Sequence, residues 1–305
     1  MSFEVAGKVV LITGGSRGLG LVMARQLVAQ DARVAICARD PDELARAKRD
    51  LGNVLAVPCD VTQPEQLERL VNEVAHLLGP IDVLINNAGV IQVGPMKHMM
   101  IEDYERAMET HFWAPLRLSL AVIPKMRAKG EGRIVNIASI GGKIAVPHLL
   151  PYTASKFALV GLSEGMRAEL ATDNVRVTTV VPGLMRTGSP PNALFKGRNA
   201  DEYAWFAAGD SSHLTAMQAE RAARQILSAM KRGRPEITLS VQAKIATRLF
   251  ALAPNLMQRA LSVVARLLPK PGGIGDASAL GSESRRGPSL LTRASDRASL
   301  RNNEA

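Results

Sequence analysis

The sequence predicts an α/β protein in which helices cover both faces of a doubly wound, parallel sheet. From residue 8 to about residue 182, short β-branched runs alternate with helical patterns, as in repeated βαβ units. The runs are almost wholly apolar, which is typical of strands that are buried on both faces. Strands are expected at Val9–Thr13, Arg33–Cys37, Val54–Pro58, Val83–Asn86, Arg133–Ala138 and Arg176–Val181.

Helix starts can be read between these strands. Thr62 followed by Glu65 predicts a capping box, with Pro64 in the first turn of the helix. Asp40 followed by Pro41 predicts the start of the preceding helix. Each predicted helix therefore connects two parallel strands, as a crossover connection must.

The chain is expected to form a single domain with a C-terminal helical extension. Residues 1–240 form the domain, which closes on a last strand at Glu236–Ser240. A loop at about 184–215, where aromatic residues cluster in an aromatic-poor chain, is expected to cover a binding site. Residues 241–270 are expected to form a basic amphipathic helical extension. Residues 271–305 lack periodicity and are expected to be disordered.

Composition indicates a globular protein of a reducing compartment. Hydrophobic residues make up 47% of the chain and charged residues 22%, an ordinary globular balance. Cys37 and Cys59 are too few for a disulfide framework and lack metal-ligand spacing, so no metal site is expected. The sequence shows no signal-peptide pattern and no apolar window long enough to span a bilayer. We expect a cytoplasmic protein and leave membrane association open.

The net charge of +10 is concentrated late in the chain, because residues 231–270 contain eight basic residues and one acidic residue. A solvated basic face is the ordinary interpretation of such a cluster, and an anionic membrane surface is the main alternative. For the helical segment 243–268, packing on the domain or on a sister subunit competes evenly with membrane contact. Nucleic acid is not expected as a partner, because only Phe250 offers an aromatic ring among these charges.

A glycine-rich segment follows the first strand and precedes a helical pattern that starts at Leu21. Gly14, Gly18 and Gly20 let the backbone turn tightly and approach a pyrophosphate, whose charge a helix N-terminus would meet. The segment predicts a dinucleotide site, while a tight turn without a ligand is the alternative that this motif alone leaves open.

The order of the motifs along the chain resembles that of the short-chain dehydrogenase/reductase family. The glycine segment matches the family's T-G-x-x-x-G-x-G rather than the commoner G-x-G-x-x-G, and the resemblance extends from residue 8 to about residue 190. The other matching segments are Asp60-Val61, Asn86-Asn87-Ala88-Gly89, Pro182-Gly183 with Thr187, and the side chains Ser139, Tyr152 and Lys156.

The resemblance implies a Rossmann-type sheet, oxidoreductase activity, a nicotinamide cofactor and a homodimer or homotetramer. The residues expected to bind the cofactor are Gly14, Ser16, Arg17, Gly18, Leu19, Gly20, Arg39, Asp60, Val61, Asn87, Ala88, Gly89, Tyr152, Lys156, Pro182, Gly183 and Thr187.

The end of the second strand predicts a preference for NADP(H) over NAD(H). A carboxylate at this position would bind the adenosine ribose and repel a 2′-phosphate, but the chain has Ala38 followed by Arg39. The guanidinium groups of Arg17 and Arg39 suit bidentate contacts with that phosphate. In the alternative, Asp40 turns into the ribose site.

Ser139, Tyr152 and Lys156 are the expected catalytic residues. Lys156 lies four residues after Tyr152, so on a helix the two share a face, and the ammonium lowers the phenol pKa from its ordinary value of about 10. In the mechanism that the resemblance implies, Tyr152 transfers the hydroxyl proton, Ser139 hydrogen-bonds the substrate oxygen, and Lys156 also holds the nicotinamide ribose. The cofactor supplies the hydride.

His111 departs from the family pattern. The family usually has Asn at this helix position, where it supports a water-mediated proton relay. A neutral imidazole can both donate and accept a hydrogen bond, so we expect His111 to act as a fourth catalytic residue in that relay. An impaired or pH-sensitive site and a histidine uninvolved in chemistry are the alternatives.

The leading functional hypothesis is an enzyme that interconverts a carbonyl and a secondary alcohol on an apolar small molecule. Val146, Leu149 and the Trp205-Phe206 region are expected to wall its pocket. The alternative hypothesis is a non-catalytic NADP(H)-binding scaffold or redox sensor.

Overall fold

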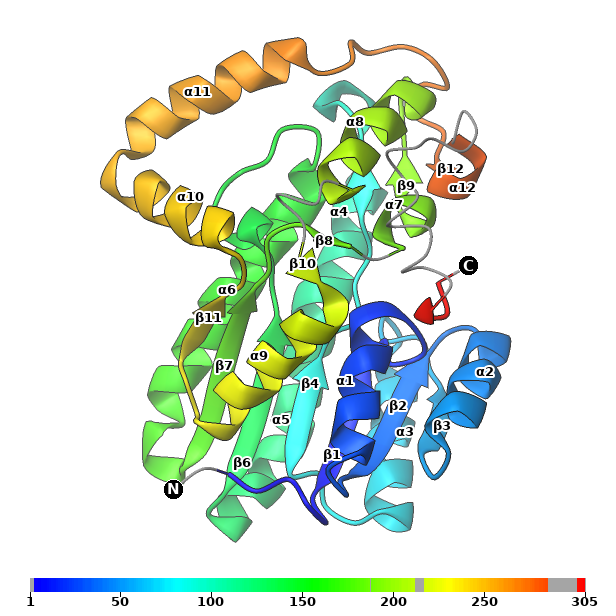
Figure 1. Ribbon diagram of the computed structural model, residues 1–305, viewed down its shortest axis with the longest axis vertical. Coiled ribbons are helices and arrows are strands. Elements are labelled where there is room, and N and C mark those ends of the chain that lie inside the picture. The colour runs from blue at the N-terminus through cyan, green and yellow to red at the C-terminus, as the bar shows by residue number, and fades with distance from the viewer. Residues whose placement is uncertain (1–2, 187, 212–216, 285–300, 305) are drawn as a thin grey trace.

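A parallel seven-stranded sheet forms the centre of the computed structural model, which describes residues 3–186, 188–211, 217–284 and 301–304 (Figure 1). Its strands are β1 (Val9–Thr13), β2 (Arg33–Ala38), β3 (Leu55–Pro58), β4 (Val83–Asn86), β6 (Gly132–Ile137), β7 (Val175–Val181) and β11 (Glu236–Thr238). They are arranged in the order β11-β7-β6-β4-β1-β2-β3. The strand order reverses between β1 and β4, and open α/β sheets bind their ligands at such a switch point. The predicted fold class is confirmed.

Helices cover both faces of the sheet and divide the core into two layers. On one face lie α1 (Gly18–Val28), α2 (Pro41–Leu51) and α9 (Ala219–Lys231). On the other face lie α3 (Pro64–Leu77) and α5 (Ala114–Lys129). Along β1, Val10 and Ile12 belong to the first layer, whereas Val9 and Leu11 belong to the second. Both sets are buried, which explains why the strand has no polar alternation.

The predicted strand boundaries agree with the structure to within one or two residues, but one predicted helix cap is wrong. Gln63, not Thr62, is the N-cap of α3, and its side chain makes no capping hydrogen bond. The Thr62 hydroxyl instead donates to Asp60 Oδ1 at 2.9 Å. Asp40 caps α2 as expected, because its carboxylate accepts from the backbone N–H groups of Asp42 and Glu43.

A smaller lobe covers the carboxyl ends of the central strands. It contains a three-stranded sheet of β5 (Gln92–Val93), β9 (Leu194–Phe195) and β12 (Ala279–Leu280), with α7 (Ser189–Asn192), α8 (Asn199–Ser211) and α12 (Gly281–Ser284). Phe195, Tyr203 and Phe206 form its apolar centre. Much of the segment expected as a covering loop at 184–215 is therefore helix and strand.

Parts of residues 271–305 differ from the expected disordered tail. β12 pairs antiparallel with β9, and residues 301–304 lie against the glycine loop, where Asn302 is buried. Residues 285–300 and 305 lie outside the described residues. The composition of the tail did not reveal these contacts, because they are made by isolated residues without periodicity.

Two helices, α10 (Val241–Leu252) and α11 (Pro254–Leu267), form an arm that extends from the end of β11 (Figure 1). Among their residues only Ala243 is buried. The chain turns between the two helices at Pro254. In the described parts of the chain, no helix has the length and apolar character needed to cross a membrane.

Candidate active site

The motif residues gather at the carboxyl ends of four central strands. The glycine loop follows β1, the Asn87–Gly89 segment follows β4, Ser139 follows β6, and Pro182-Gly183 follow β7. Because these strands are consecutive neighbours in the sheet, four segments that are distant in sequence meet at one end of it (Figure 1). The motifs are therefore parts of one site at the topological switch point.

The glycine loop comes so close to its neighbours that side chains would collide there. Gly14 and Gly18 have positive φ angles of 62° and 54°. A Cβ on Gly20 would lie 2.1 Å from the carbonyl oxygen of Gly14, and a Cβ on Gly14 would lie 2.9 Å from the Cα of Ala88. α1 begins at Gly18, and the side chain of its N-cap Arg17 does not cap it. The first N–H groups of the helix are thus left for other acceptors, which suits an anion.

Asn87 holds the glycine loop in place with its side-chain amide. Its Nδ2 donates to the carbonyl oxygens of Thr13 and Gly14, both at 3.0 Å. In return, Thr13 Oγ1 accepts from the backbone N–H groups of Asn87 and Ala88, also at 3.0 Å. The sequence assigned Asn87 and Ala88 to the cofactor but gave no role to Thr13, which joins the two loops.

At the end of β2, the two predicted phosphate ligands have different surroundings. Arg39 is exposed, whereas Arg17 donates to Glu43 Oε1 at 2.8 Å and to Asn192 Oδ1 at 2.9 Å. Ser16 Oγ donates to the other Glu43 oxygen at 2.9 Å. The sequence missed Glu43, because a glutamate in the first turn of a helix is an ordinary dipole partner. The backbone N–H of Glu43 is also the main cause that lowers the pKa of Asp40.

The remaining predicted cofactor residues lie at the same end of the sheet. Asp60 Oδ1 accepts from the backbone N–H and the hydroxyl of Thr62, and Val61 is buried. The carbonyl oxygen of Pro182 accepts from Ile140 N–H at 2.8 Å. A Cβ on Gly183 would lie 2.8 Å from the Oγ of Ser240. Leu19 is buried in the core below the loop, and Thr187 lies outside the described residues.

Ser139 and Tyr152 face the same small space beside Gly141. A Cβ on Gly141 would lie 3.1 Å from Tyr152 Cε1 and 3.5 Å from Ser139 Oγ. Tyr152 and Lys156 lie on α6 (Leu150–Glu169), and Lys156 Nζ is 5.6 Å from the centroid of the Tyr152 ring. The structure thus brings together the three residues that the sequence selected.

Lys156 is buried, with 4% of its surface exposed. Its ammonium donates to the backbone carbonyl oxygen of Ile137 at 2.8 Å, at the end of β6. Burial lowers the pKa of Lys156 from 10.5 to about 7, because a charge is poorly solvated in the protein interior. The strand that Ser139 follows therefore also holds the Lys156 ammonium beside the Tyr152 ring.

His111 lies in a π-helical turn, η2 (Glu109–Trp113), between α4 (Ile101–Met108) and α5. Its Nε2 accepts from the backbone N–H of Val90 at 3.1 Å, and its Nδ1 lies 2.8 Å from Ser155 Oγ. The Ser155 hydroxyl donates to the carbonyl oxygen of Tyr152 at 2.9 Å. We therefore assign the proton to Nδ1, which donates to Ser155.

This arrangement differs from the expected water relay, because the protein engages both ring nitrogens of His111. Burial, and secondarily Lys156, lowers the pKa of His111 well below its ordinary value of 6.5. The neutral ring packs edge-on against Tyr152, with centroids 5.4 Å apart. We infer that His111 is a positioning residue for the helix that carries Tyr152.

The segment 301–304 lies on the glycine loop. Gly18 N–H donates to the carbonyl oxygen of Asn302 at 2.9 Å, and Asn303 Nδ2 donates to that of Ser16 at 2.9 Å. A Glu304 carboxylate oxygen accepts from Gly188 N–H at 2.6 Å, and the other would lie 2.8 Å from a Cβ on Gly18. A carboxylate therefore fits between the glycine loop and the segment after β7, so this cradle suits an anion such as the diphosphate of a dinucleotide.

Apolar side chains of the smaller lobe lie beside Tyr152. Val146, Trp205 and Tyr152 pack against the cluster that contains the buried Leu149 and Phe206. Glu202, which is fully buried, holds this cluster in place. It accepts from Trp205 Nε1 at 2.7 Å, and one of its oxygens lies 2.8 Å from His148 Nδ1.

The doubly wound sheet, the glycine turn before α1 and the adjacent serine, tyrosine and lysine define a dinucleotide-dependent oxidoreductase. The family model described as short chain dehydrogenase matches residues 8–193. The chain belongs to the short-chain dehydrogenase family, whose members use nicotinamide cofactors.

Similar proteins support this assignment over most of the chain. A dehydrogenase/reductase SDR family protein 7-like of Anopheles gambiae is 34% identical over 82% of this chain and 80% of its own length. The ketoacyl reductase HetN of a Nostoc strain is 39% identical over 59% of this chain and 64% of its own length.

Solved structures show the same architecture. A short-chain dehydrogenase from Streptomyces avermitilis has a TM-score of 0.75 at 30% identity, covering 87% of this chain and 99% of that protein. An L-sorbose reductase from Gluconobacter frateurii, complexed with NADPH and L-sorbose, has a TM-score of 0.70 at 27% identity, covering 79% and 97% of the two chains.

Replacing Lys156 with Met tests the cost of its burial. Between pH 7 and 10.5 the unfolded lysine binds a proton that the folded one releases, so wild-type stability rises with pH in this range. At pH 6 the wild type bears the full free-energy cost of burying a charged lysine at position 156. We expect Lys156→Met to lose activity yet to increase the free energy of unfolding at pH 6 by about 2 kcal/mol, after the lost hydrogen bond is subtracted.

Urea denaturation at pH 6 and pH 9.5 measures this effect, which should shrink at the higher pH. Lys125→Met, on the exposed side of α5, is the control. A variant at residue 156 that is less stable than the wild type at pH 6 would contradict the assigned cost.

Proposed function

We propose that this protein is an NADP(H)-dependent oxidoreductase that interconverts a carbonyl and a secondary alcohol on an apolar small molecule. The proposal is carried by the meeting of the Ser139 hydroxyl and the Tyr152 ring at Gly141, next to the buried Lys156. The relatives named as ketoacyl reductases and the sorbose reductase complexed with NADPH support a carbonyl substrate.

The three side chains divide the proton chemistry between them. Ser139 Oγ accepts from Gly141 N–H at 3.0 Å, which leaves its own proton to donate to the substrate oxygen. Tyr152 gives or takes the proton of the alcohol. The Lys156 ammonium favours the ionised phenol when Tyr152 has lost its proton. When bound, the nicotinamide supplies or accepts the hydride.

The walls of the site favour an apolar substrate. The partly buried Val146 and Trp205 offer apolar or aromatic surface near Tyr152 and pack on the buried Leu149 and Phe206. The buried Glu202 faces His148 and the Trp205 indole rather than this surface. An apolar body with one carbonyl or hydroxyl group matches walls of this kind with two polar groups, Ser139 and Tyr152, at one end.

Replacing Tyr152 with Phe tests the proposed chemistry by removing only the phenol oxygen. In an NADPH-oxidation assay against diverse ketones and aldehydes, we expect kcat to fall by about 10²- to 10⁴-fold, the usual contribution of a general acid. Tyr104→Phe, on α4 and outside the site, should keep wild-type rates. The proposal would be refuted by substrate turnover at the wild-type rate in Tyr152→Phe.

The surroundings of β2 favour NADP(H) as the cofactor. Ala38 leaves no carboxylate to bind the ribose, and Asp40, which could have served, is engaged as the N-cap of α2. Arg39 is exposed and makes no ion pair with any described residue. Glu43 opposes this preference, because its carboxylate already holds Arg17 and would repel a 2′-phosphate. We therefore assign the main phosphate contact to Arg39.

Comparing kcat/KM for the two cofactors tests this assignment. We expect the wild type to prefer NADPH over NADH, and Arg39→Gln to lower kcat/KM for NADPH by about tenfold, the loss of one charged contact, with little change for NADH. Arg49→Gln, on the exposed face of α2, is the control. Equal values for the two cofactors in the wild type, or an NADH advantage, would contradict the preference.

The non-catalytic scaffold or redox sensor is a weaker proposal. His111, which departs from the family pattern, contacts the helix of Tyr152 through Ser155, and the grouping of Ser139, Tyr152 and Lys156 favours the enzyme over the scaffold. The homodimer or homotetramer, the cytoplasmic location and the membrane contact of residues 241–270 stay predictions of the sequence.

A further inference from the structure

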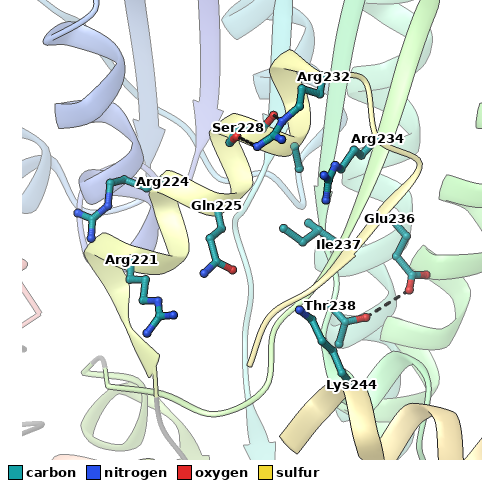
Figure 2. A pocket seen from close by; sticks show the side chains of 11 residues that line it. Arg221, Arg224, Gln225, Ser228, Arg232, Arg234, Glu236, Ile237, Thr238 and Lys244 are labelled. Atoms are coloured by element: carbon teal, nitrogen blue, oxygen red, sulfur yellow. Dashed lines mark hydrogen bonds between the residues drawn. The ribbon is translucent and has the colours of Figure 1, made fainter. Parts of the chain in front are cut away.

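A basic pocket lies between α9, β11 and the start of α10, and none of its residues belongs to the active site. Its volume is about 660 Å³. Figure 2 shows the side chains of Arg221, Arg224, Arg232 and Arg234, from α9 and the turn after it, around the same hollow as Lys244 of α10. The pocket lies where the helical arm leaves the sheet domain.

The positive charges of this pocket have almost no negative charges to compensate them. Its one carboxylate, Glu236, pairs with Lys143 at 2.9 Å. Within the described residues, the side chains of Arg221, Arg224, Arg234 and Lys244 make no ion pair. Five cations around one hollow repel each other, and an anion between them relieves that repulsion. Guanidinium groups suit a phosphate, which they can bind bidentately.

The adjoining arm exposes apolar stripes. On α11, Leu256, Val263 and Leu267 are 67%, 55% and 80% exposed, and their spacing places them on one face. On α10, Ile245 and Leu252 are 54% and 83% exposed. Water-facing apolar stripes of this length on two consecutive helices indicate an apolar contact.

The arm and the pocket share the same sign of charge. Between Glu236 and Asp276 the sequence contains no acidic residue, whereas Lys244, Arg248 and Arg259 are among its basic ones. Apolar stripes flanked by cations only, next to a basic pocket, are complementary to an anionic bilayer surface.

We propose that the pocket of α9, β11 and α10 binds the phosphate of an anionic phospholipid while α10 and α11 lie in the interface of the bilayer. A free phosphate would satisfy the pocket but would leave the stripes in water. A second copy of the chain placed symmetrically on the pocket would bring five cations against five cations, which costs free energy. Of these three occupants, the bilayer satisfies both features.

Flotation of the full chain with vesicles tests the proposal. We expect binding to vesicles of mixed phosphatidylcholine and phosphatidylglycerol, no comparable binding to phosphatidylcholine alone, and weakening by salt. The double variant Arg221→Gln/Arg234→Gln should weaken binding by about tenfold or more, since each basic residue near the surface contributes on the order of 1 kcal/mol. Leu256→Gln/Leu267→Gln should weaken it at unchanged net charge.

The matched control is Arg49→Gln/Arg69→Gln, which removes the same charge from α2 and α3 near the opposite edge of the sheet. Equal losses in the control and pocket variants would overturn the site, because bulk charge would then explain binding. Equal binding to both vesicle types would do the same. Stabilisation by inorganic phosphate without vesicle binding, or self-association lost in the pocket variant, would replace the bilayer with another occupant.

A second inference, which rests on the proposed cofactor site, concerns residues 301–304. Asn302 and Asn303 hydrogen-bond the glycine loop at Gly18 and Ser16. Asn303 also donates to the carbonyl oxygen of Glu43 on α2, and Glu304 accepts from the N–H of Gly188 after β7. Arg25 and Arg46 also bind this segment, at Asn302 Oδ1 and Asn303 Oδ1. These contacts come from both sides of the loop, so they define one docked position.

The geometry points to an autoinhibitory contact in which the Glu304 carboxylate takes the position of the cofactor diphosphate. Its oxygens lie between Gly18, at the start of α1, and Gly188, just after the family's P-G-x-x-x-T segment. A dinucleotide that spans from the end of β2 to the end of β7 must pass between Gly18 and Gly188. Cofactor and segment 301–304 therefore exclude each other.

Direct titration of NADPH, followed by its fluorescence, tests this contact without substrate. We expect Glu304→Ala and Asn303→Ala to lower the Kd for NADPH by about threefold or more, because the competing closed state loses population. Glu68→Ala, on the exposed face of α3, should leave the Kd unchanged. A measurable Kd that is equal in all four proteins would overturn the contact but leave the cofactor site standing, whereas no NADPH binding in any of them would overturn both.

Discussion

The close contact between the glycine loop and the loop after β4 is the constraint on which the site depends. A Cβ on Gly20 would lie only 2.1 Å from the Gly14 carbonyl oxygen and 2.6 Å from Asn87 Nδ2. Any side chain at Gly20 would push α1 away from the sheet and break the hydrogen bonds of Asn87. The same contact thus aligns the start of α1 with β4. It also fixes the distance between the glycine loop and the side chains of Ser139 and Tyr152.

A second set of hydrogen bonds ties Lys156 and the helix that carries Tyr152 to backbone atoms at or just after the ends of β6 and β4. Lys156 binds the Ile137 carbonyl at the end of β6, and His111 links Val90, after β4, to Ser155 on α6. His111, Ser155 and Lys156 are buried, so an unmade hydrogen bond at one of these side chains would cost on the order of 1–3 kcal/mol. The helix that carries Tyr152 is thereby held in one register relative to the strands below it.

Most of the fold and the grouping of Ser139, Tyr152 and Lys156 could be predicted from the sequence, because both depend on local patterns. The apolar runs gave the strands, and the spacing of Tyr152 and Lys156 placed them on one helix face. The side-chain partners of those groups could not be predicted in this way. Glu43 reaches Arg17 across 26 positions and Asn303 reaches Ser16 across 287, and neither residue has a pattern that marks such a contact.

The two proposed anion sites differ in the physical origin of their attraction. The cradle at Gly18 and Gly188 uses backbone N–H groups, which act only at hydrogen-bonding distance. The pocket at Arg221 and Arg234 uses whole charges, whose field reaches about 10 Å in dilute salt and is screened beyond that distance. Salt therefore acts mainly on the pocket. The proposed cofactor binding and the proposed bilayer binding can therefore vary independently, because the groups responsible lie on different elements and respond differently to salt.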